Sequence, residues 1–414
     1  MTRPQSSHAA VWPLVVVLAV LVLLPVGRTS EVAVAVGGVL ALVLLSRGRI
    51  DWRHDGIVRL VAILFACYWI PELVSAIAPV NPAKTGATLA STLRFLPFAV
   101  FAGYALRDAS RWSAVIAAVA VVVALWVIDA FVQLTTGYSL GGAAEAERLS
   151  GIFGAGNLKL GPVLAVLSPF VLVAARDRFG WRGIAFAFVF LLVPILLAGS
   201  RAAWLMYALV CVVMAWRETR SARRFALAIG AAALVMACVA AVALHDSRSF
   251  DARIGRSLLA LGGTESAVDD ASAGRLSIWH TAFSMWRAHP IAGVGVRGFR
   301  YAYPTYASPQ DRFVDVESDT GASHAHQIVL EVLSETGAVG LLFWLAGVGF
   351  AVRAWWRADA EARSRAFAPA LALVAMCFPL NTHLAFYSAW WGLLFWWLLA
   401  LYCAALGARG NVDA

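Results

Sequence analysis

Two histidines separated by one residue lie where a hydrophilic segment gives way to an apolar one. His324 and His326 belong to the sequence Ser-His-Ala-His-Gln at 323–327, and apolar residues follow at once. A neutral imidazole in such a position is a good general base, because its pKa lies near ambient pH. The pair is also compatible with a metal site or with interfacial hydrogen bonds, but no third metal ligand stands at a suitable spacing. We predict that His326 is the base, because it opens the apolar run, and that no metal is bound.

Cationic side chains could bind an anionic substrate. Arg201 follows a short Ala-Gly-Ser turn and opens an apolar run, so the free N–H groups of a helix start and a guanidinium would meet there, as phosphate binding requires. The same residue could instead anchor its helix at a membrane interface. Arg94 lies inside an apolar run, where an arginine either forms an internal ion pair, here with Glu72 or Asp129, or faces a wet cavity. Lys84 precedes Arg94 in the same region of the chain.

Two other motifs say little about chemistry. Residues 293–298 read Gly-Val-Gly-Val-Arg-Gly, a literal match to the dinucleotide-binding pattern, but no strand precedes them, so we expect a tight glycine turn. Asp315, Glu317 and Asp319 alternate along a polar stretch and could hold a hard cation. We interpret this stretch as a solvated acidic loop. Neither motif implies a cofactor, and none is predicted.

The elements that must position these residues are apolar runs long enough to span a membrane. The chain has 414 residues, of which 61% are hydrophobic and 14% charged, and this composition excludes an ordinary soluble protein. Within lipid the backbone must satisfy its own hydrogen bonds, which favours helices. We therefore predict an all-α polytopic membrane protein, a single membrane domain over residues 1–414 with about 12 transmembrane helices. The predicted spans are 11–27, 32–45, 57–78, 88–106, 112–134, 160–175, 184–198, 202–216, 225–244, 327–344, 367–384 and 388–406.

The basic residues give these spans a direction. With the N-terminus in the cytoplasm, 19 of the 33 lysines and arginines lie in or beside the cytoplasmic connections. Eight of the other 14 fall in one long hydrophilic segment, and long segments cross the membrane regardless of charge. The positive-inside rule thus predicts that both termini are cytoplasmic and that the His and Arg candidates face outward. Because this topology explains the formal net charge of +9, no nucleic-acid partner is expected.

The long hydrophilic segment, residues 245–325, is predicted to be an external insertion between the ninth and tenth spans. Within it, residues 273–288 have apolar side chains at helical spacing and end at a His-Pro pair, which predicts a helix. Trp279 and Trp286 share its apolar face, as expected for a helix on the membrane surface or packed on the spans. All five cysteines of the chain fall in apolar runs, which indicates core residues rather than a disulfide framework.

Four segments of the chain, taken together, resemble the O-antigen ligase family, within the larger group that shares the Wzy-type C-terminal membrane domain. Their order and their positions around the long insertion match that family. One departure is that the family usually has His-Asn where this chain has His326 and Gln327, and the glutamine keeps the amide. The segments are Gly-Ser-Arg-Ala at 199–202, Gly-Arg-Leu-Ser-Ile-Trp at 274–279, His-Pro-Ile-Ala-Gly-Val-Gly-Val-Arg-Gly-Phe at 289–299, and residues 323–340 with the two histidines.

The resemblance implies a GT-C-like fold and a glycosyltransferase that moves a polysaccharide from undecaprenyl diphosphate to lipid A–core oligosaccharide, on the periplasmic side of the bacterial inner membrane. That donor, that acceptor and the membrane lipids are the expected partners. Direct attack of a sugar hydroxyl on the anomeric carbon would invert its configuration, with arginines rather than a metal stabilising the leaving diphosphate. The expected catalytic residues are His326, Arg201 and Arg275, and the expected substrate contacts are Lys84, Arg94, His324, Arg297 and Gln327.

Other functions stay open at the level of sequence. A Wzy-type O-antigen polymerase and an O-linked protein oligosaccharyltransferase share the donor and the motifs, and they differ in the acceptor. A transporter or flippase for a lipid-linked sugar predicts charges within the spans and internal symmetry. Arg94 is the one clear charge of that kind, and no repeat is detectable. The sequence therefore favours a transferase and does not choose among acceptors.

Overall fold

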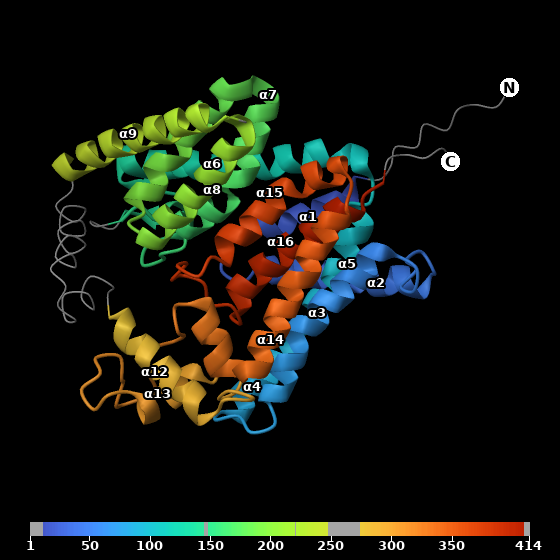
Figure 1. Cartoon of the computed structure of the whole chain (residues 1–414), viewed down its shortest axis with the longest axis vertical. Helices are drawn as coiled ribbons and strands as arrows, with labels where there is room; N and C mark the ends of the chain where they lie inside the picture. Colours follow the sequence, from blue (N-terminus) through green and yellow to red (C-terminus); the bar gives the residue numbers. More distant parts are fainter. Residues whose placement is uncertain (1–10, 145–147, 220, 247–273, 410–414) are drawn as a thin grey trace.

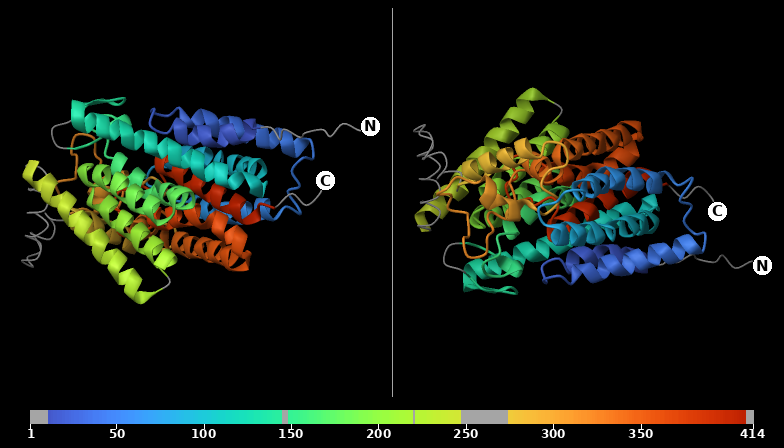
Figure 2. Two further views of the ribbon diagram at one scale, coloured as in Figure 1. Left: turned by 90° about the horizontal axis from the view of Figure 1, so that it is seen from above. Right: turned by 90° about the horizontal axis from the view of Figure 1, so that it is seen from below.

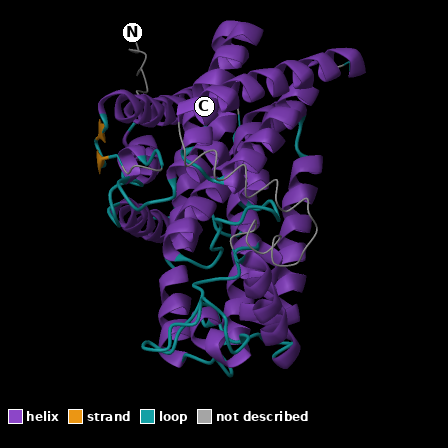
Figure 3. Cartoon of the chain, turned by 90° about the vertical axis from the view of Figure 1, so that its left-hand side faces the viewer, coloured by secondary structure: helices purple, strands orange, loops and turns teal. Residues whose placement is uncertain are grey.

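A computed structural model of the chain describes residues 11–144, 148–219, 221–246 and 274–409. The described chain is almost entirely helical, as predicted, and its helices form an elongated bundle (Figures 1 and 3). A short antiparallel hairpin joins β1 (Tyr138–Ser139) to β2 (Gly142–Ala143). The helices are α1 (Trp12–Val22), α2 (Ser30–Ser46), α3 (Gly56–Ser75), α4 (Pro82–Thr92), α5 (Phe95–Ala105), α6 (Trp112–Thr136), α7 (Leu160–Leu197), α8 (Arg201–Thr219), α9 (Ala222–Asp246), α12 (Arg275–Ala288), α13 (Phe299–Tyr306), α14 (Ile328–Arg357), α15 (Ala360–Met376) and α16 (Ala389–Gly407), with 3-10 turns η1 (Ala109–Arg111) and η2 (Gly151–Phe153).

Within the described residues, eight helices are long and apolar enough to cross a membrane. This is fewer than the predicted number of about 12, for three physical reasons. The helices α1 and α2 are apolar but shorter than a full span. The helix α15 has 17 residues, and charged side chains occupy its first turns. The helix α7 is one element of 38 residues, although it contains two of the predicted spans.

The chain turns back on itself within α7. Gly180 has φ 63° and ψ −148°, a conformation that a side chain disfavours, and it separates two helical arms. A Cβ placed on Gly161 would lie 3.0 Å from the Cβ of Ala198, so the two ends of α7 are neighbours. The arms therefore run antiparallel, and they correspond to the separate spans predicted at 160–175 and 184–198.

Connections that the sequence places in the cytoplasm meet at one end of the bundle. Arg107 contacts the carboxylate of Asp55 at 3.3 Å. The N–H of Arg409, beyond α16, donates to the carbonyl of Arg107 at 3.0 Å. Arg365, in the first turns of α15, donates to the carbonyl of Ala408 at 2.9 Å. The starts and ends of α3, α5, α15 and α16 are thus held together by basic residues at this end.

The opposite end of the bundle gathers the connections predicted to be external. Trp390, at the start of α16, donates through Nε1 to the carbonyl of Leu24, just after α1. The N–H of Val80, between α3 and α4, donates to the carbonyl of Val294 at 2.9 Å. Figure 1 shows α12, α13 and α4 together at this end, below α3 and α14. The described part of the insertion therefore lies opposite the basic connections.

The helix α16 is the centre of the core. It is apolar on every side, which is typical of a helix surrounded by others. Trp396 and Trp397 are each 1% exposed, and Trp397 donates to the carbonyl of Val17 at 2.8 Å. Helices α3, α5 and α15 pack around it, and the views from above and below show the red C-terminal helix in the interior of the bundle (Figure 2). This arrangement holds the two ends of the bundle in a fixed relation.

The predicted span at 367–384 is wrong at its C-terminal end. The helix α15 stops at Met376, because Pro379 cannot continue a helix and Asn381 donates to the carbonyl of Met376 at 2.7 Å. Residues 377–388 form a loop instead, at the end of the bundle opposite the basic connections. This loop carries Thr382 and His383, and both matter for the site described below.

The helix predicted at 273–288 is present as α12, residues Arg275–Ala288. Its buried stripe consists of Ile278, Ala282 and Met285 together with the polar Thr281, whereas Phe283 is 45% exposed. The stripe packs with residues of α13 in a small second core, separate from that of the bundle. The aromatic face singled out in the sequence therefore turns partly outward, and the helix is anchored by its smaller apolar residues.

One fold-level prediction concerns the ion pair between Arg94 and Glu31. Each side chain is 23% exposed, and Arg94 donates to both carboxylate oxygens, at 2.7 and 2.9 Å, which ties α5 to α2. We expect Glu31→Arg or Arg94→Glu alone to lower the free energy of unfolding by about 1–3 kcal/mol, because an uncompensated charge is left half-buried. The swapped double variant should recover most of this loss in thermal unfolding of the detergent-solubilised protein. A swapped protein no more stable than the singles would argue against the pair.

Candidate functional site

The helix α14 is interrupted near its start, and a loop of the insertion supplies backbone hydrogen bonds at the interruption. Gly337 has φ 69° and ψ −164°, so the backbone on both sides of it loses its helical hydrogen bonds. Residues 290–295 replace them by pairing along the open turn. The bonds run from Val294 N to Ser334 O (2.9 Å), from Gly295 N to Glu335 O (3.1 Å), from Ala338 N to Pro290 O (2.8 Å) and from Val339 N to Ile291 O (3.2 Å).

The glycines of this motif are required by the close approach of the two backbones. A Cβ on Gly293 would lie 2.4 Å from the carbonyl carbon of Glu335, and one on Gly337 would lie 2.1 Å from the oxygen of Ile291. Gly295 also has a positive φ, 98°. The motif at 293–298 is thus a tight glycine turn, as predicted, and it fixes the loop against the helix that follows the two histidines.

His326 is held in one orientation and one tautomer. Its backbone has a φ of 54°, a left-handed conformation that is unusual for a residue with a side chain. Its Nδ1 lies 2.8 Å from the carbonyl oxygen of Thr382. A carbonyl only accepts, so Nδ1 carries the proton and the lone pair of the neutral ring is on Nε2. This is the arrangement that a general base requires.

Two more imidazoles accompany His326. The ring centroid of His324 lies 3.9 Å from that of His326, and its Nδ1 lies 2.8 Å from Ser323 Oγ. Burial, and then the nearby charges of Arg275 and other cationic groups, lower the pKa of His383 to about 4. Burial likewise holds the pKa of His324 well below its usual value, with His326 and Arg297 adding to the effect. The cluster is therefore uncharged at neutral pH.

Arg201 and Arg275 come together from different parts of the chain. Arg201 is the first residue of α8, after a turn at Gly199 (φ 69°), and Ser200 Oγ accepts the N–H of Ala203 there. Arg275 is the first residue of α12. Burial, and second the positive charge of Arg201, lower the pKa of Arg275 to about 10, so it stays cationic at neutral pH. Two guanidinium groups that repel each other at two helix starts favour an anion between them.

The other predicted contact residues divide into two groups. Arg297 interacts electrostatically with His324, and Gln327 caps α14 by accepting the N–H of Leu330 at 2.6 Å, so both belong to the histidine cluster. Lys84 is exposed in the first turn of α4 and interacts at long range with Glu335. Arg94 is paired with Glu31, not with Glu72 or Asp129 as the sequence suggested.

The acidic stretch lies outside this cluster. Asp315, Glu317 and Asp319 are exposed, and Asp315 accepts hydrogen bonds from Glu317 N and from the hydroxyl and N–H of Ser318. These bonds hold the pKa of Asp315 below its usual value. Nowhere in the described ranges do three His, Cys, Asp or Glu side chains meet as metal ligands.

Sequence reasoning missed three contributors to the site. His383 and Thr382 lie in the loop after α15, which their apolar surroundings assigned to a span. Arg148 interacts electrostatically with His383. From the sequence it was only one of the basic residues in the connections predicted to be external. An asparagine and a proline within the apolar run, Asn381 and Pro379, were the available signals that the helix ends early.

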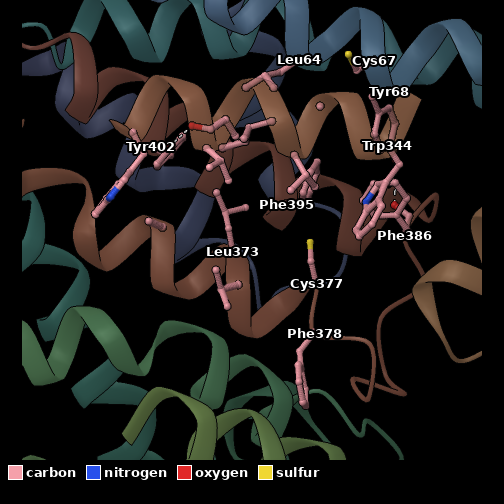
Figure 4. A pocket seen from close by; sticks show the side chains of 18 of the residues that line it. Leu64, Cys67, Tyr68, Trp344, Leu373, Cys377, Phe378, Phe386, Phe395 and Tyr402 are labelled. Atoms are coloured by element: carbon pink, nitrogen blue, oxygen red, sulfur yellow. Dashed lines mark hydrogen bonds between the residues drawn. The ribbon is translucent and has the colours of Figure 1, made fainter. Parts of the chain in front are cut away.

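An apolar groove runs through the bundle beside this site. Its volume is about 640 Å³, and helices α3, α14, α15 and α16 supply most of its lining, including Tyr68, Trp344, Leu373 and Phe395 (Figure 4). Tyr387 lines the groove, and its N–H contacts the carboxylate of Glu331 at 3.4 Å, on the first turns of α14. The groove therefore extends from the loop that carries His383 into the membrane-spanning region.

Comparison with known proteins gives one result. Residues 186–345 match the family described as O-antigen ligase. This segment contains Arg201, Arg275, Arg297 and both histidines of the 323–327 motif, but not His383 or Lys84. No curated protein matches the chain significantly.

The site predicts how any base-assisted reaction should depend on pH. Burial is the main cause that lowers the pKa of His326, Arg275 adds to it, and the bond to Thr382 opposes it, with a net decrease from 6.5. The neutral base is present above this pKa and is lost as pH falls through it. We therefore expect initial rates to stay near their plateau at pH 6.5 and to decline only at lower pH, in a series between about pH 4 and 9. An acid limb at or above the ordinary histidine pKa would contradict this environment for His326.

Proposed function

We propose that this chain, whose residues 186–345 match the O-antigen ligase family, transfers a polysaccharide from undecaprenyl diphosphate to lipid A–core oligosaccharide. In this proposal the site faces the periplasm, the protein lies in the bacterial inner membrane, and both termini are cytoplasmic. The observation that carries the proposal is the convergence of an oriented imidazole, His326, with Arg201 and Arg275 beside an apolar groove.

The donor diphosphate is bound by the two arginines. Arg201 and Arg275 offer bidentate forks at helix starts, and the repulsion between them is relieved when an anion binds. As the bond from the sugar to the diphosphate breaks, charge grows on the leaving oxygen. The contacts to the arginines are then stronger in the transition state than in the ground state, which accelerates the reaction without a metal.

The base acts on the acceptor. Nε2 of neutral His326 takes the proton of an acceptor-sugar hydroxyl while that oxygen forms a bond to the anomeric carbon. The bond between the anomeric carbon and the diphosphate oxygen breaks in the same step, and its electron pair stays on the diphosphate. The anomeric configuration is inverted. The imidazolium, stabilised by the carbonyl of Thr382, then releases its proton to water.

The groove supports a lipid-linked substrate rather than a soluble one. Its lining is almost entirely aliphatic and aromatic, and it reaches Tyr387, whose N–H contacts Glu331 on the first turns of α14. A volume of about 640 Å³ suits part of one lipid chain and not a cluster of acyl chains. This favours the polyprenyl tail of the donor as its occupant.

Reconstitution tests the proposal directly. Purified protein in liposomes is supplied with undecaprenyl-diphosphate-linked glycan and with lipid A–core, a second glycan-linked lipid, or an acceptor protein, each with and without EDTA. We expect glycan on lipid A–core, with inverted anomeric configuration and unchanged rate in EDTA. Transfer to the second glycan would assign a polymerase, transfer to protein would assign an oligosaccharyltransferase, and loss of activity in EDTA would contradict the metal-free mechanism.

A prediction separates the two neighbouring histidines. Because His326 carries the oriented lone pair, His326→Ala should reduce the turnover number by about 10²–10⁴-fold while the donor still binds. His324→Ala should have a smaller effect on turnover, because its Nδ1 bonds the hydroxyl of Ser323, which can donate or accept and therefore does not fix the tautomer. Both variants are compared with His289→Ala, whose imidazole bonds to Tyr306 in the insertion, away from the cluster. An inactive His324 variant beside an active His326 variant would mean that the other imidazole is the base.

A further inference from the structure

Arg297 has a backbone that is fixed from several sides. Its φ of 59° is left-handed, a property shared in the described chain only with Asp319 and His326 among residues other than glycine. The residue before it, Val296, donates its N–H to Ser75 Oγ at 3.0 Å and accepts from Thr85 Oγ1 at 3.1 Å. The loop thus reaches Arg297 already anchored to α3 and α4.

Glu335 supplies the last of these contacts from inside a membrane-spanning helix. Its side chain is 0% exposed, and its Oε2 accepts the N–H of Arg297 at 2.6 Å. Its Oε1 has no hydrogen-bond partner in the described part of the chain. A buried, half-satisfied carboxylate is costly in a span, and a neutral side chain would be cheaper there. Stability alone therefore does not account for an acid at this position.

The guanidinium of Arg297 acts on both the buried acids and the histidine cluster. It interacts electrostatically with Glu331 and Glu335 and also with His324. Its Nη1 is buried and has no hydrogen-bond partner within the described residues. The carboxylate that fixes the backbone thus also contributes to the field around the side chain.

We propose that Glu335 is a positioning residue for acceptor binding, which it serves by holding Arg297 in its left-handed conformation beside His324. The inference rests on the proposed function, in which the acceptor hydroxyl meets the neighbouring His326. Arg297 then binds the acceptor oligosaccharide through the unpartnered edge of its guanidinium. Glu335 itself touches no substrate, and its whole effect passes through Arg297.

A double-mutant cycle on the kinetics tests this dependence. Arg297→Ala should raise the acceptor KM by about tenfold or more, with kcat and the donor KM changed little, because a uniform binding contact is lost. Glu335→Gln should raise the same KM by a smaller factor, since its amide oxygen still accepts the N–H but carries no charge. Combining both changes should be no worse than Arg297→Ala alone.

The control is Glu72→Gln in α3. Glu72 is also 0% exposed and has one unpartnered carboxylate oxygen, but its partner is Thr92 Oγ1 and not the loop. It should leave the acceptor KM unchanged. Thermal unfolding of each variant separates a loss of folding from a loss of binding. If Glu335→Gln does not fold, Glu335→Asp, which keeps the carboxyl group, is used in its place.

The outcomes distinguish this inference from the proposed function. A wild-type protein that fails to glycosylate lipid A–core overturns the proposed function itself. If the wild type is active but the KM effects of Glu335 and Arg297 multiply independently, or if Glu72→Gln matches Glu335→Gln, the positioning role is overturned. An effect of Glu335 on kcat alone would also overturn it, because that would place the residue in the chemical step.

Discussion

The opening of α14 at Gly337 is the constraint on which the site depends. In a membrane, backbone groups without partners are costly, so a helix opens there only if another segment takes over its hydrogen bonds. Residues 290–295 do so. The loop and the interrupted helix therefore depend on each other for these hydrogen bonds. Through this pairing the insertion is registered against the start of α14, where Gln327 and the two histidines lie.

The arginines of the chain show how the same side chain serves different purposes. Arg94 has a bidentate carboxylate partner, which neutralises it and ties two helices together. Arg201 and Arg275 are the first residues of two helices, and the positive charge of Arg201 adds to burial in lowering the pKa of Arg275. In the proposed function these two side chains bind the donor diphosphate.

The histidine cluster follows the same logic. Burial and neighbouring cations keep the three imidazoles uncharged, so the cluster adds no further repulsion to the arginines. Only His326 has its proton assigned to Nδ1 by a carbonyl oxygen. A lowered pKa makes it a weaker base, but it remains in the active form at the pH where it must work. Binding and proton transfer are therefore assigned to different residues of one site.

Much of this organisation was accessible from the sequence. Hydropathy predicted most of the helical spans and the helix α12, and the Ala-Gly-Ser turn correctly placed Arg201 at a helix start. The partner of Arg94 was not predictable, because Glu31 lies 63 residues away and only packing brings it near. The roles of Thr382 and His383 could not be predicted, because the apolar residues around them led hydropathy to assign both to a transmembrane span. The interruption of α14 at Gly337 could not be predicted, because the sequence does not reveal the φ angle of a single glycine in an apolar helix.

In the proposed mechanism the arginines bind the diphosphate and His326 performs the chemistry. These roles can be separated by measuring the affinity for undecaprenyl diphosphate, without glycan or acceptor, on purified protein in lipid nanodiscs. We expect Arg201→Ala and Arg275→Ala to weaken binding strongly, the corresponding lysine variants to recover it only in part, and His326→Ala to bind like the wild type. Wild-type affinity in both alanine variants, or loss of binding in His326→Ala, would contradict this mechanism.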